Sequence, residues 1–112
     1  MDERPGGWLR IHGSEIAALG HFRPPDPLEG ETVVDLGGLV LAPGFIDLHC
    51  HGAGGGRATD EGIETMARFK VCHGTTAFAP TAQSLEAEWL GRIARYRSGP
   101  PPGALVLGAH VE

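Results

Sequence analysis

The second part of the sequence alternates short apolar stretches of strand character with amphipathic stretches of helical character. We expect strands at residues 45–51, 75–79 and 104–112, separated by helices at about 59–73 and 85–97. This order, with short connections, is typical of parallel β-α units with right-handed crossovers. Three parallel strands and two helices leave a sheet unfinished, so we expect the chain to be a piece of a longer protein.

The first part of the chain has a different character. We expect short strands and an extended continuation at residues 8–11, 15–19, 32–36 and 39–41. Three prolines between residues 21 and 30 predict a loop there, because proline fixes φ and lacks the backbone donor. Residues 1–43 are therefore predicted to be a partial β domain, and residues 44–112 the first β/α units of a second domain.

Composition excludes several classes of protein. The 112 residues carry a net charge of −5, which argues against a nucleic-acid partner, since such partners need clustered Lys and Arg. No stretch reaches the roughly 18 apolar residues of a membrane span, and the charged N-terminus has no apolar run of a secretory signal. Two cysteines are too few for a disulfide scaffold. We therefore expect a cytoplasmic protein without a membrane or nucleic-acid partner.

A His-x-His pair is the sharpest chemical feature. In a strand with period-two alternation, Asp47, His49 and His51 share one face, while Ile46, Leu48 and Cys50 share the other. Two imidazoles on one face suit zinc and related transition metals. Glu112, at the end of the third predicted strand, could supply a carboxylate ligand, because parallel β-α units gather functional groups at the carboxyl edge of the sheet.

Each of these residues also has a plain structural interpretation. The histidine pair could be an exposed strand end without ligands, and Asp47 could either orient a ligand imidazole or be a satisfied polar group within the sheet. Cys50 lies between the histidines, but alternation directs it to the helix side, so a buried structural thiol is favoured. His110 shares the face of Glu112 and has no firm role.

The predicted element ends rest on local signals. Thr59 or Asp60 is expected to cap the first helix, and Gly74 to end it. Pro80 is expected to end the second strand, and Ser84 to cap the second helix. Thr81 is assigned to strand propensity and capping.

A glycine-rich segment, residues 52–56, follows the His-x-His strand. Such loops can bind phosphate, but Arg57 breaks the G-x-G-x-x-G pattern and no Gly-Lys-Ser/Thr is present. A flexible loop beside an active site is the favoured interpretation.

Four stretches of the sequence together resemble a known family. Residues 42–52, Ala-Pro-Gly-Phe-Ile-Asp-Leu-His-Cys-His-Gly, resemble the first-strand signature of the amidohydrolase superfamily. With the glycine-rich segment, residues 74–81 (Gly-Thr-Thr-Ala-Phe-Ala-Pro-Thr) and residues 107–112 (Leu-Gly-Ala-His-Val-Glu) look like the N-acetylglucosamine-6-phosphate deacetylase family within it. The resemblance covers residues 31–112.

The resemblance implies a fold and a reaction. The fold would be α/β: the start of a metal-dependent (β/α)8 TIM-like barrel, preceded by part of a small β-sandwich domain. A divalent metal, zinc or iron and one or two per site, would activate water to deacetylate N-acetylglucosamine 6-phosphate, an amino-sugar phosphate. His49, His51 and Glu112 would be metal ligands.

The same resemblance places the rest of the machinery beyond residue 112. The catalytic aspartate, the other metal histidines and the residues that hold the sugar phosphate are expected there, so no catalytic residue is assigned in these 112 residues. The full-length protein is expected to be a homodimer. We predict that the 112-residue polypeptide alone is inactive and poorly stable.

Two other hypotheses stay open. The chain could belong to a different amidohydrolase, such as a dihydroorotase, hydantoinase or nucleobase deaminase, although Glu112 at the end of the third strand argues against these. It could also be a non-catalytic truncated product whose open sheet edge favours association.

Overall fold

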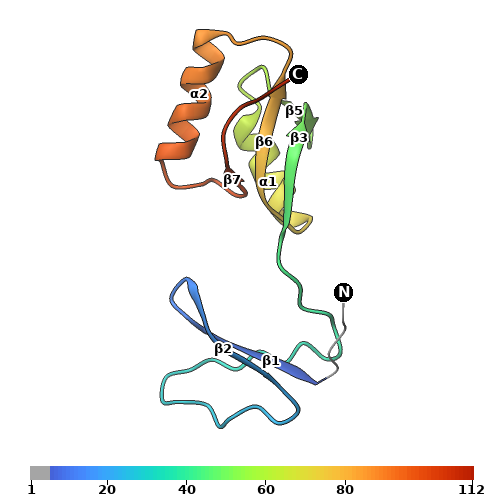
Figure 1. Ribbon diagram of the computed structural model, residues 1–112, viewed down its shortest axis with the longest axis vertical. Helices are drawn as coiled ribbons and strands as arrows, with labels where there is room; N and C mark the ends of the chain where they lie inside the picture. Colours follow the sequence, from blue (N-terminus) through green and yellow to red (C-terminus); the bar gives the residue numbers. More distant parts are fainter. Residues whose placement is uncertain (1–5) are drawn as a thin grey trace. The chain divides into compact units, whose positions relative to one another are not determined.

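The structure is a computed structural model that describes residues 6–112 (Figure 1). The chain divides into two compact units, of which the first runs to Val40 and the second comprises Leu41–Glu112. The sequence analysis placed the boundary after residue 43. Within the part of the chain that the structure describes, no helix is long and apolar enough to cross a membrane.

The first unit is built on one β-hairpin. Strands β1 (Gly7–His12) and β2 (Glu15–His21) pair antiparallel, in agreement with the two strands predicted there. Gly13 turns the chain between them with a φ of 61°, a conformation that glycine adopts without steric cost.

The third strand predicted in this unit, at residues 32–36, is absent, and residues 39–41 are not a strand either. Asp35 accepts a hydrogen bond from the backbone N–H of Gly37 at 2.8 Å, and Gly37 and Gly38 both have positive φ values. These contacts favour a turn over a strand. Val33 and Val34 are 70% and 73% exposed, so the apolar residues that suggested a strand have no sheet to pack into.

The second unit is a parallel sheet with two helices. Strand β6 (Thr75–Ala82) is central and pairs in parallel with β3 (Phe45–Cys50), β7 (Leu105–Val106) and β8 (His110–Val111). Helices α1 (Ile63–Cys72) and α2 (Ala87–Ser98) connect successive strands. The predicted β-α-β-α-β order is confirmed, and the unit is α/β and compatible with the start of a barrel (Figure 1).

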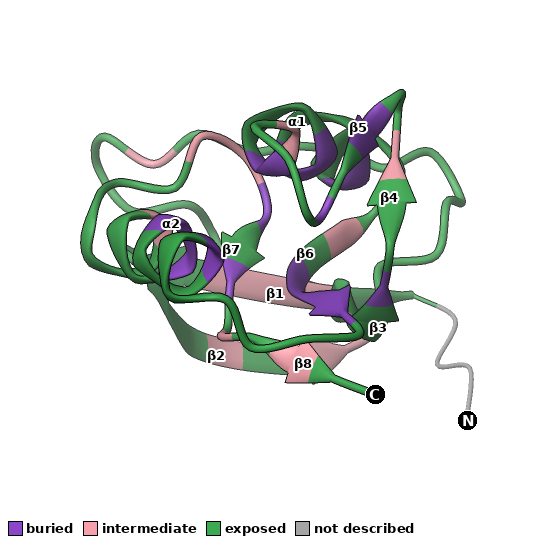
Figure 2. Cartoon of the chain, turned by 90° about the horizontal axis from the view of Figure 1, so that it is seen from above, coloured by how far each residue is buried: buried purple, intermediate pink, exposed green. Residues whose placement is uncertain are grey.

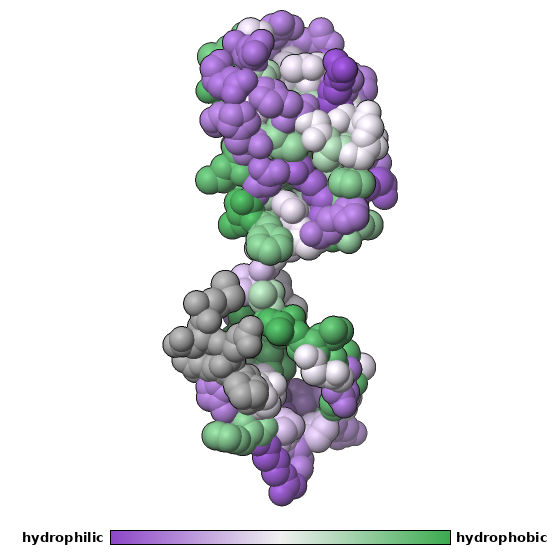
Figure 3. All heavy atoms as spheres, turned by 90° about the vertical axis from the view of Figure 1, so that its right-hand side faces the viewer, coloured by the Kyte–Doolittle hydropathy of each residue, from purple (hydrophilic) through white to green (hydrophobic). Residues whose placement is uncertain are grey.

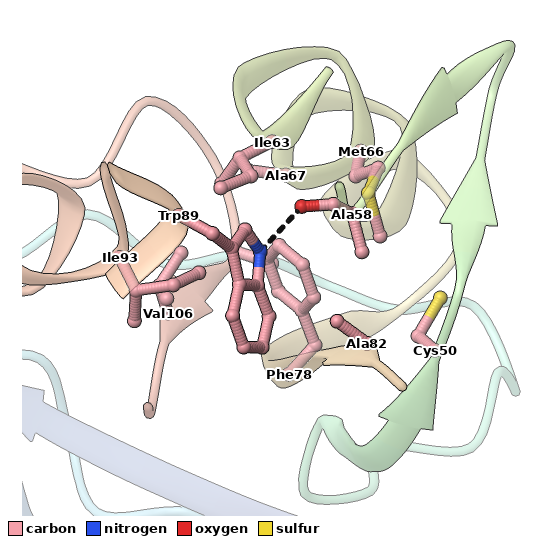
Figure 4. Close-up of a cluster of buried hydrophobic side chains, with 11 residues drawn as sticks. Cys50, Ala58, Ile63, Met66, Ala67, Phe78, Ala82, Trp89, Ile93 and Val106 are labelled. Atoms are coloured by element: carbon pink, nitrogen blue, oxygen red, sulfur yellow. Dashed lines mark hydrogen bonds between the residues drawn. The ribbon is translucent and has the colours of Figure 1, made fainter. Parts of the chain in front are cut away.

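The core of this unit lies between the sheet and the helices (Figures 2 and 4). Phe78 of β6 is fully buried, and Trp89 of α2 packs beside it while its indole N–H donates to the carbonyl oxygen of Ala58 at 2.7 Å. Ile63 and Met66 of α1 close the cluster. Apolar side chains also reach the surface in both units, where they are green in Figure 3.

Both predicted helix caps are wrong. Helix α1 begins after Gly62, and Asp60 instead accepts hydrogen bonds from the backbone N–H groups of Gly62 and Arg57, which builds the turn before the helix. Helix α2 begins after Glu86, two residues beyond Ser84, whose hydroxyl donates to the Glu86 carboxylate at 3.2 Å. Gly74, with a φ of 81°, follows the end of α1 as predicted.

Two strand ends also differ from the prediction. Strand β6 continues through Pro80 to Ala82. Its neighbour changes from β7 to β8 between residues 78 and 81, so no backbone N–H is needed at the proline. The predicted third strand, residues 104–112, is divided into β7 and β8, which pair with different parts of β6.

The glycine-rich segment forms a hairpin, although a flexible loop was predicted. Strands β4 (Gly52–Ala53) and β5 (Gly56–Arg57) pair antiparallel. Gly54 and Gly55 between them have φ values of 59° and 88°, and positive φ at both central residues is the geometry of a two-residue hairpin turn. A Cβ on Gly54 would lie 2.6 Å from Phe69, so the turn is held close against α1.

Candidate metal centre

The strand that carries the histidines does not alternate as predicted. Its register against β6 shifts between Asp47 and Cys50. Ile46 and Leu48 are 62% and 63% exposed while Cys50 is buried, so these three side chains do not share one face. Asp47 reaches Lys70 of α1, so its placement on the histidine face was also wrong. A single irregularity resets the parity of every later residue in a strand.

His49, His51 and Glu112 nevertheless converge. Glu112 lies directly after β8 and the histidines lie at the end of β3, and these strands flank β6. The Nε2 atoms of His49 and His51 lie 2.9 and 3.1 Å from the two oxygens of Glu112, and 3.2 Å from each other. The side chains are 36–53% exposed, so the cluster is open to solvent.

The donor set of this cluster fits a transition-metal ion. Two imidazole nitrogens and one carboxylate oxygen, all within 4.8 Å of one another, are ligand types that zinc and iron accept. Among residues 6–112, this is the one group of three such side chains with that spacing. His49, His51 and Glu112 are therefore the residues that could hold a metal.

His110 lies beside the cluster. Its ring centroid is 4.6 Å from that of His49, and its Nδ1 is 3.3 Å from the hydroxyl of Thr81. Thr81 is fully buried, and its hydroxyl oxygen also accepts the backbone N–H of Cys50 at 2.8 Å. One buried hydroxyl thus connects the end of β3 with the start of β8. The expectation that Thr81 serves strand propensity and capping missed this contact.

A second polar cluster connects β3 with helix α1. Lys70 Nζ donates to Asp47 Oδ2 at 2.5 Å, and the Lys70 side chain is only 8% exposed. The hydrogen bond from Lys70 holds the pKa of Asp47 below its ordinary value. Burial alone would lower the pKa of Lys70, but its contacts with Asp47 and Cys50 outweigh burial and raise it. Both groups are therefore charged across the neutral pH range.

Lys70 was missed by the sequence analysis, although a signal for it exists. The buried residues of α1 are Ile63, Met66, Ala67 and Lys70. Their spacing is that of one helix face, so a lysine continues an apolar stripe. A lysine at such a position needs a buried counter-charge, and Asp47 on the adjacent strand provides it.

Cys50 and the lone histidines are not among the three candidate metal ligands. Cys50 is buried and free, and its thiol donates to the carbonyl oxygen of Gly52 at 3.3 Å, which confirms a structural thiol. His73 stacks on Phe69 at the end of α1, with ring centroids 4.3 Å apart. His12 and His21 lie in the first unit.

Comparison with known sequences finds hydrolytic amidohydrolase enzymes, deacetylases and dihydroorotases, among the relatives of this chain. The predicted resemblance to N-acetylglucosamine-6-phosphate deacetylases is confirmed. The deacetylase of Rattus norvegicus is 40% identical over 87 residues, 70% of this chain and 21% of the relative. That of Lysinibacillus sphaericus is 33% identical over 119 residues, 99% of this chain and 29% of the relative.

Dihydroorotases are similar to a shorter part of the chain. The dihydroorotase of Bacillus subtilis is 39% identical over 71 residues, 63% of this chain and 16% of the relative. The chain thus spans less than a third of the length of these curated relatives. No family model matches the sequence, and no solved structure matches it.

Proposed function

We propose that this chain supplies part of the active site of a metal-dependent deacetylase that converts N-acetylglucosamine 6-phosphate to glucosamine 6-phosphate and acetate. The observation that carries the proposal is the convergence of His49, His51 and Glu112 in a chain that is similar along 99% of its length to the deacetylase of Lysinibacillus sphaericus. The fold we propose for the whole protein is a (β/α)8 barrel that β3, β6 and β7 begin, with the first unit as part of a β-sandwich. We further propose a cytoplasmic homodimer.

The roles of the three side chains follow from their chemistry. A divalent metal, for which we propose zinc or iron, supplies Lewis acidity toward an amide carbonyl and lowers the pKa of water when bound. The His49 and His51 imidazoles and the Glu112 carboxylate would hold such an ion, with the carboxylate charge offsetting part of the charge of the metal. Their exposure leaves room for the acetamide of a substrate to approach.

A titration with Co²⁺ tests the metal site directly. We expect the unaltered chain to bind the ion with visible absorption bands, and His49→Ala, His51→Ala and Glu112→Gln each to weaken binding by about 100-fold. The matched control is His73→Ala, which changes a histidine outside the cluster and should leave binding unchanged. Equal affinities for all five proteins would exclude this site.

The substrate is tested in a chimera in which this chain replaces the matched segment of the Lysinibacillus sphaericus deacetylase. We expect acetate release from N-acetylglucosamine 6-phosphate by the chimera and its loss in the Glu112→Gln chimera. The 112-residue chain alone is expected to release none. Acetate release by the isolated chain would contradict the proposal that it supplies only part of the site.

Dihydroorotase activity is the second candidate, because the dihydroorotase of Bacillus subtilis is 39% identical to this chain over 71 residues. The corresponding chimera with that enzyme discriminates the two. Hydrolysis of dihydroorotate by this second chimera, with an inactive deacetylase chimera, would favour the alternative.

A further inference from the structure

The amide of His49 is held by a side chain instead of by the sheet alone. Asp47 Oδ1 accepts the backbone N–H of His49 at 3.1 Å, a hydrogen bond between residues two apart. This bond lies within the stretch where the register of β3 against β6 shifts. Asp side chains that bond their own backbone two residues on favour turns over regular strands. The contact therefore stabilises the irregularity that separates the direction of Asp47 from that of His49.

The other oxygen of Asp47 is anchored in the core. Asp47 Oδ2 accepts a hydrogen bond from the Lys70 ammonium at 2.5 Å. The same ammonium lies 5.4 Å from the centroid of the Phe78 ring. Phe78 is fully buried and Lys70 belongs to the buried face of α1. An ion pair with one partner in the core has a well-defined position, in contrast to a pair between two solvated side chains. The position of His49 is thus tied to helix α1.

A regular strand would have kept Asp47 and His49 on one face. In the observed strand, Asp47 points to α1 while His49 reaches Glu112. We propose that Asp47 and Lys70 are positioning residues of the metal centre: their ion pair holds the irregular turn of β3 and so aims the His49 imidazole at Glu112. The inference rests on the proposed metal site and adds two residues, of which Asp47 acts on the cluster through the backbone N–H of His49.

Backbone amide hydrogen exchange at His49, measured without metal, tests the first step. Lys70→Met keeps the approximate length of the side chain but removes the ammonium, and with it both the ion pair with Asp47 and the contact with the Phe78 ring. We expect exchange at His49 to become at least about 10-fold faster in this variant. The control is Arg68→Met, which breaks an exposed ion pair with Glu64 on the same helix and should leave the rate unchanged.

Cobalt binding by the same proteins tests the second step. We expect Lys70→Met to weaken Co²⁺ binding by about 10- to 100-fold and to change the absorption bands, as loss of an outer-sphere partner of a ligand does. Asp47→Asn/Lys70→Met should bind no more weakly than Lys70→Met alone, because the two residues act as one unit. Arg68→Met should bind as the unaltered chain does.

The outcomes separate this inference from the proposed function. An unchanged exchange rate at His49, or an unchanged affinity and spectrum in Lys70→Met, would overturn the positioning role while cobalt binding by the unaltered chain still supported the metal site. Failure of the unaltered chain to bind cobalt would overturn the metal site itself. The positioning role would then fall with it.

Discussion

The two units of this chain differ in how their local structure is stabilised. The second unit has a cluster of buried apolar side chains between its sheet and helices. In the first unit, no residue from Gly6 to Val40 is buried. Its hairpin depends on backbone hydrogen bonds and on polar contacts such as that between Arg10 and Glu31, at 2.9 Å. The candidate metal ligands all belong to the unit that has a core, where their positions can be maintained.

The largest expected effect is on the core. Phe78→Ala removes a fully buried ring, so we expect the free energy of unfolding of the second unit to fall by about 3–5 kcal/mol. Phe22→Ala in the first unit is the matched control, because that ring is 86% exposed, and it should change stability by less than about 0.5 kcal/mol. Chemical denaturation followed by circular dichroism measures both. Equal effects would mean that the two units do not differ as argued.

Metal removal gives the next effect. At a zinc concentration about 100-fold above its Kd, binding should stabilise the second unit by about 2.7 kcal/mol, and chelation should abolish that gain. Amide exchange should show the gain in β3, β6 and α1. The amides of β1 and β2 serve as internal control, and slower exchange there on adding zinc would contradict a site confined to the second unit.

The backbone at Gly103 lies close to the backbone of helix α1, which allows a further test of packing in the second unit. A Cβ on Gly103 would lie 2.5 Å from the carbonyl oxygen of Ala67 in α1. We expect Gly103→Ala to lower the free energy of unfolding by about 1–3 kcal/mol, because helix backbone cannot yield as a side chain does. Gly108→Ala, with no atom within 4 Å of the added Cβ, is the control and should have little effect.

The pH dependence of stability tests the ion pair between Asp47 and Lys70 in the second unit. Because the pKa of Asp47 is lowered from 3.8, its contribution is complete above that pH and is lost as the pH falls through the lowered value. Because the pKa of Lys70 is raised from 10.5, its contribution is complete below that pH and is lost as the pH rises through the raised value. The stability difference between the unaltered chain and Lys70→Met should therefore be flat around neutral pH and fall only toward acidic and strongly alkaline pH. A difference that varied near pH 7 would contradict this assignment.

The smallest expected effect is a gain. Gly91 lies within α2 and has no atom within 4 Å of an added Cβ. Gly91→Ala should stabilise the second unit by about 0.5–1 kcal/mol, since alanine loses less backbone entropy in a helix. Thermal unfolding of the two proteins measures it, and a lower midpoint for Gly91→Ala would show an unrecognised packing constraint.

Much of the second unit could be predicted because its signals are local. The stripe of Ile63, Met66 and Ala67 indicates a helix, and Gly74 indicates where it ends. His49, His51 and Glu112 could be named as a group because parallel strands bring their carboxyl ends to one edge. The structure brings these three residues together as predicted.

What could not be predicted depends on contacts between distant residues. The register shift in β3 accompanies the contact of Asp47 with Lys70, 23 positions away. The sequence of residues 45–51 alone does not indicate this shift. The sequence analysis expected Pro80 to end its strand. The strand can contain this proline because β7 gives way to β8 as the neighbour of β6 near it, and the sequence does not show where that change occurs. Val33 and Val34 have strand propensity, but propensity alone makes no strand without a partner to pair with.

The most direct test of the central claim is anomalous diffraction from crystals of this chain grown with zinc, recorded at the zinc absorption edge. The account predicts one strong anomalous peak within bonding distance of the His49 and His51 imidazoles and the Glu112 carboxylate, and its absence in Glu112→Gln crystals. A peak at other residues with none at this cluster, or an equally strong peak in both proteins, would contradict it.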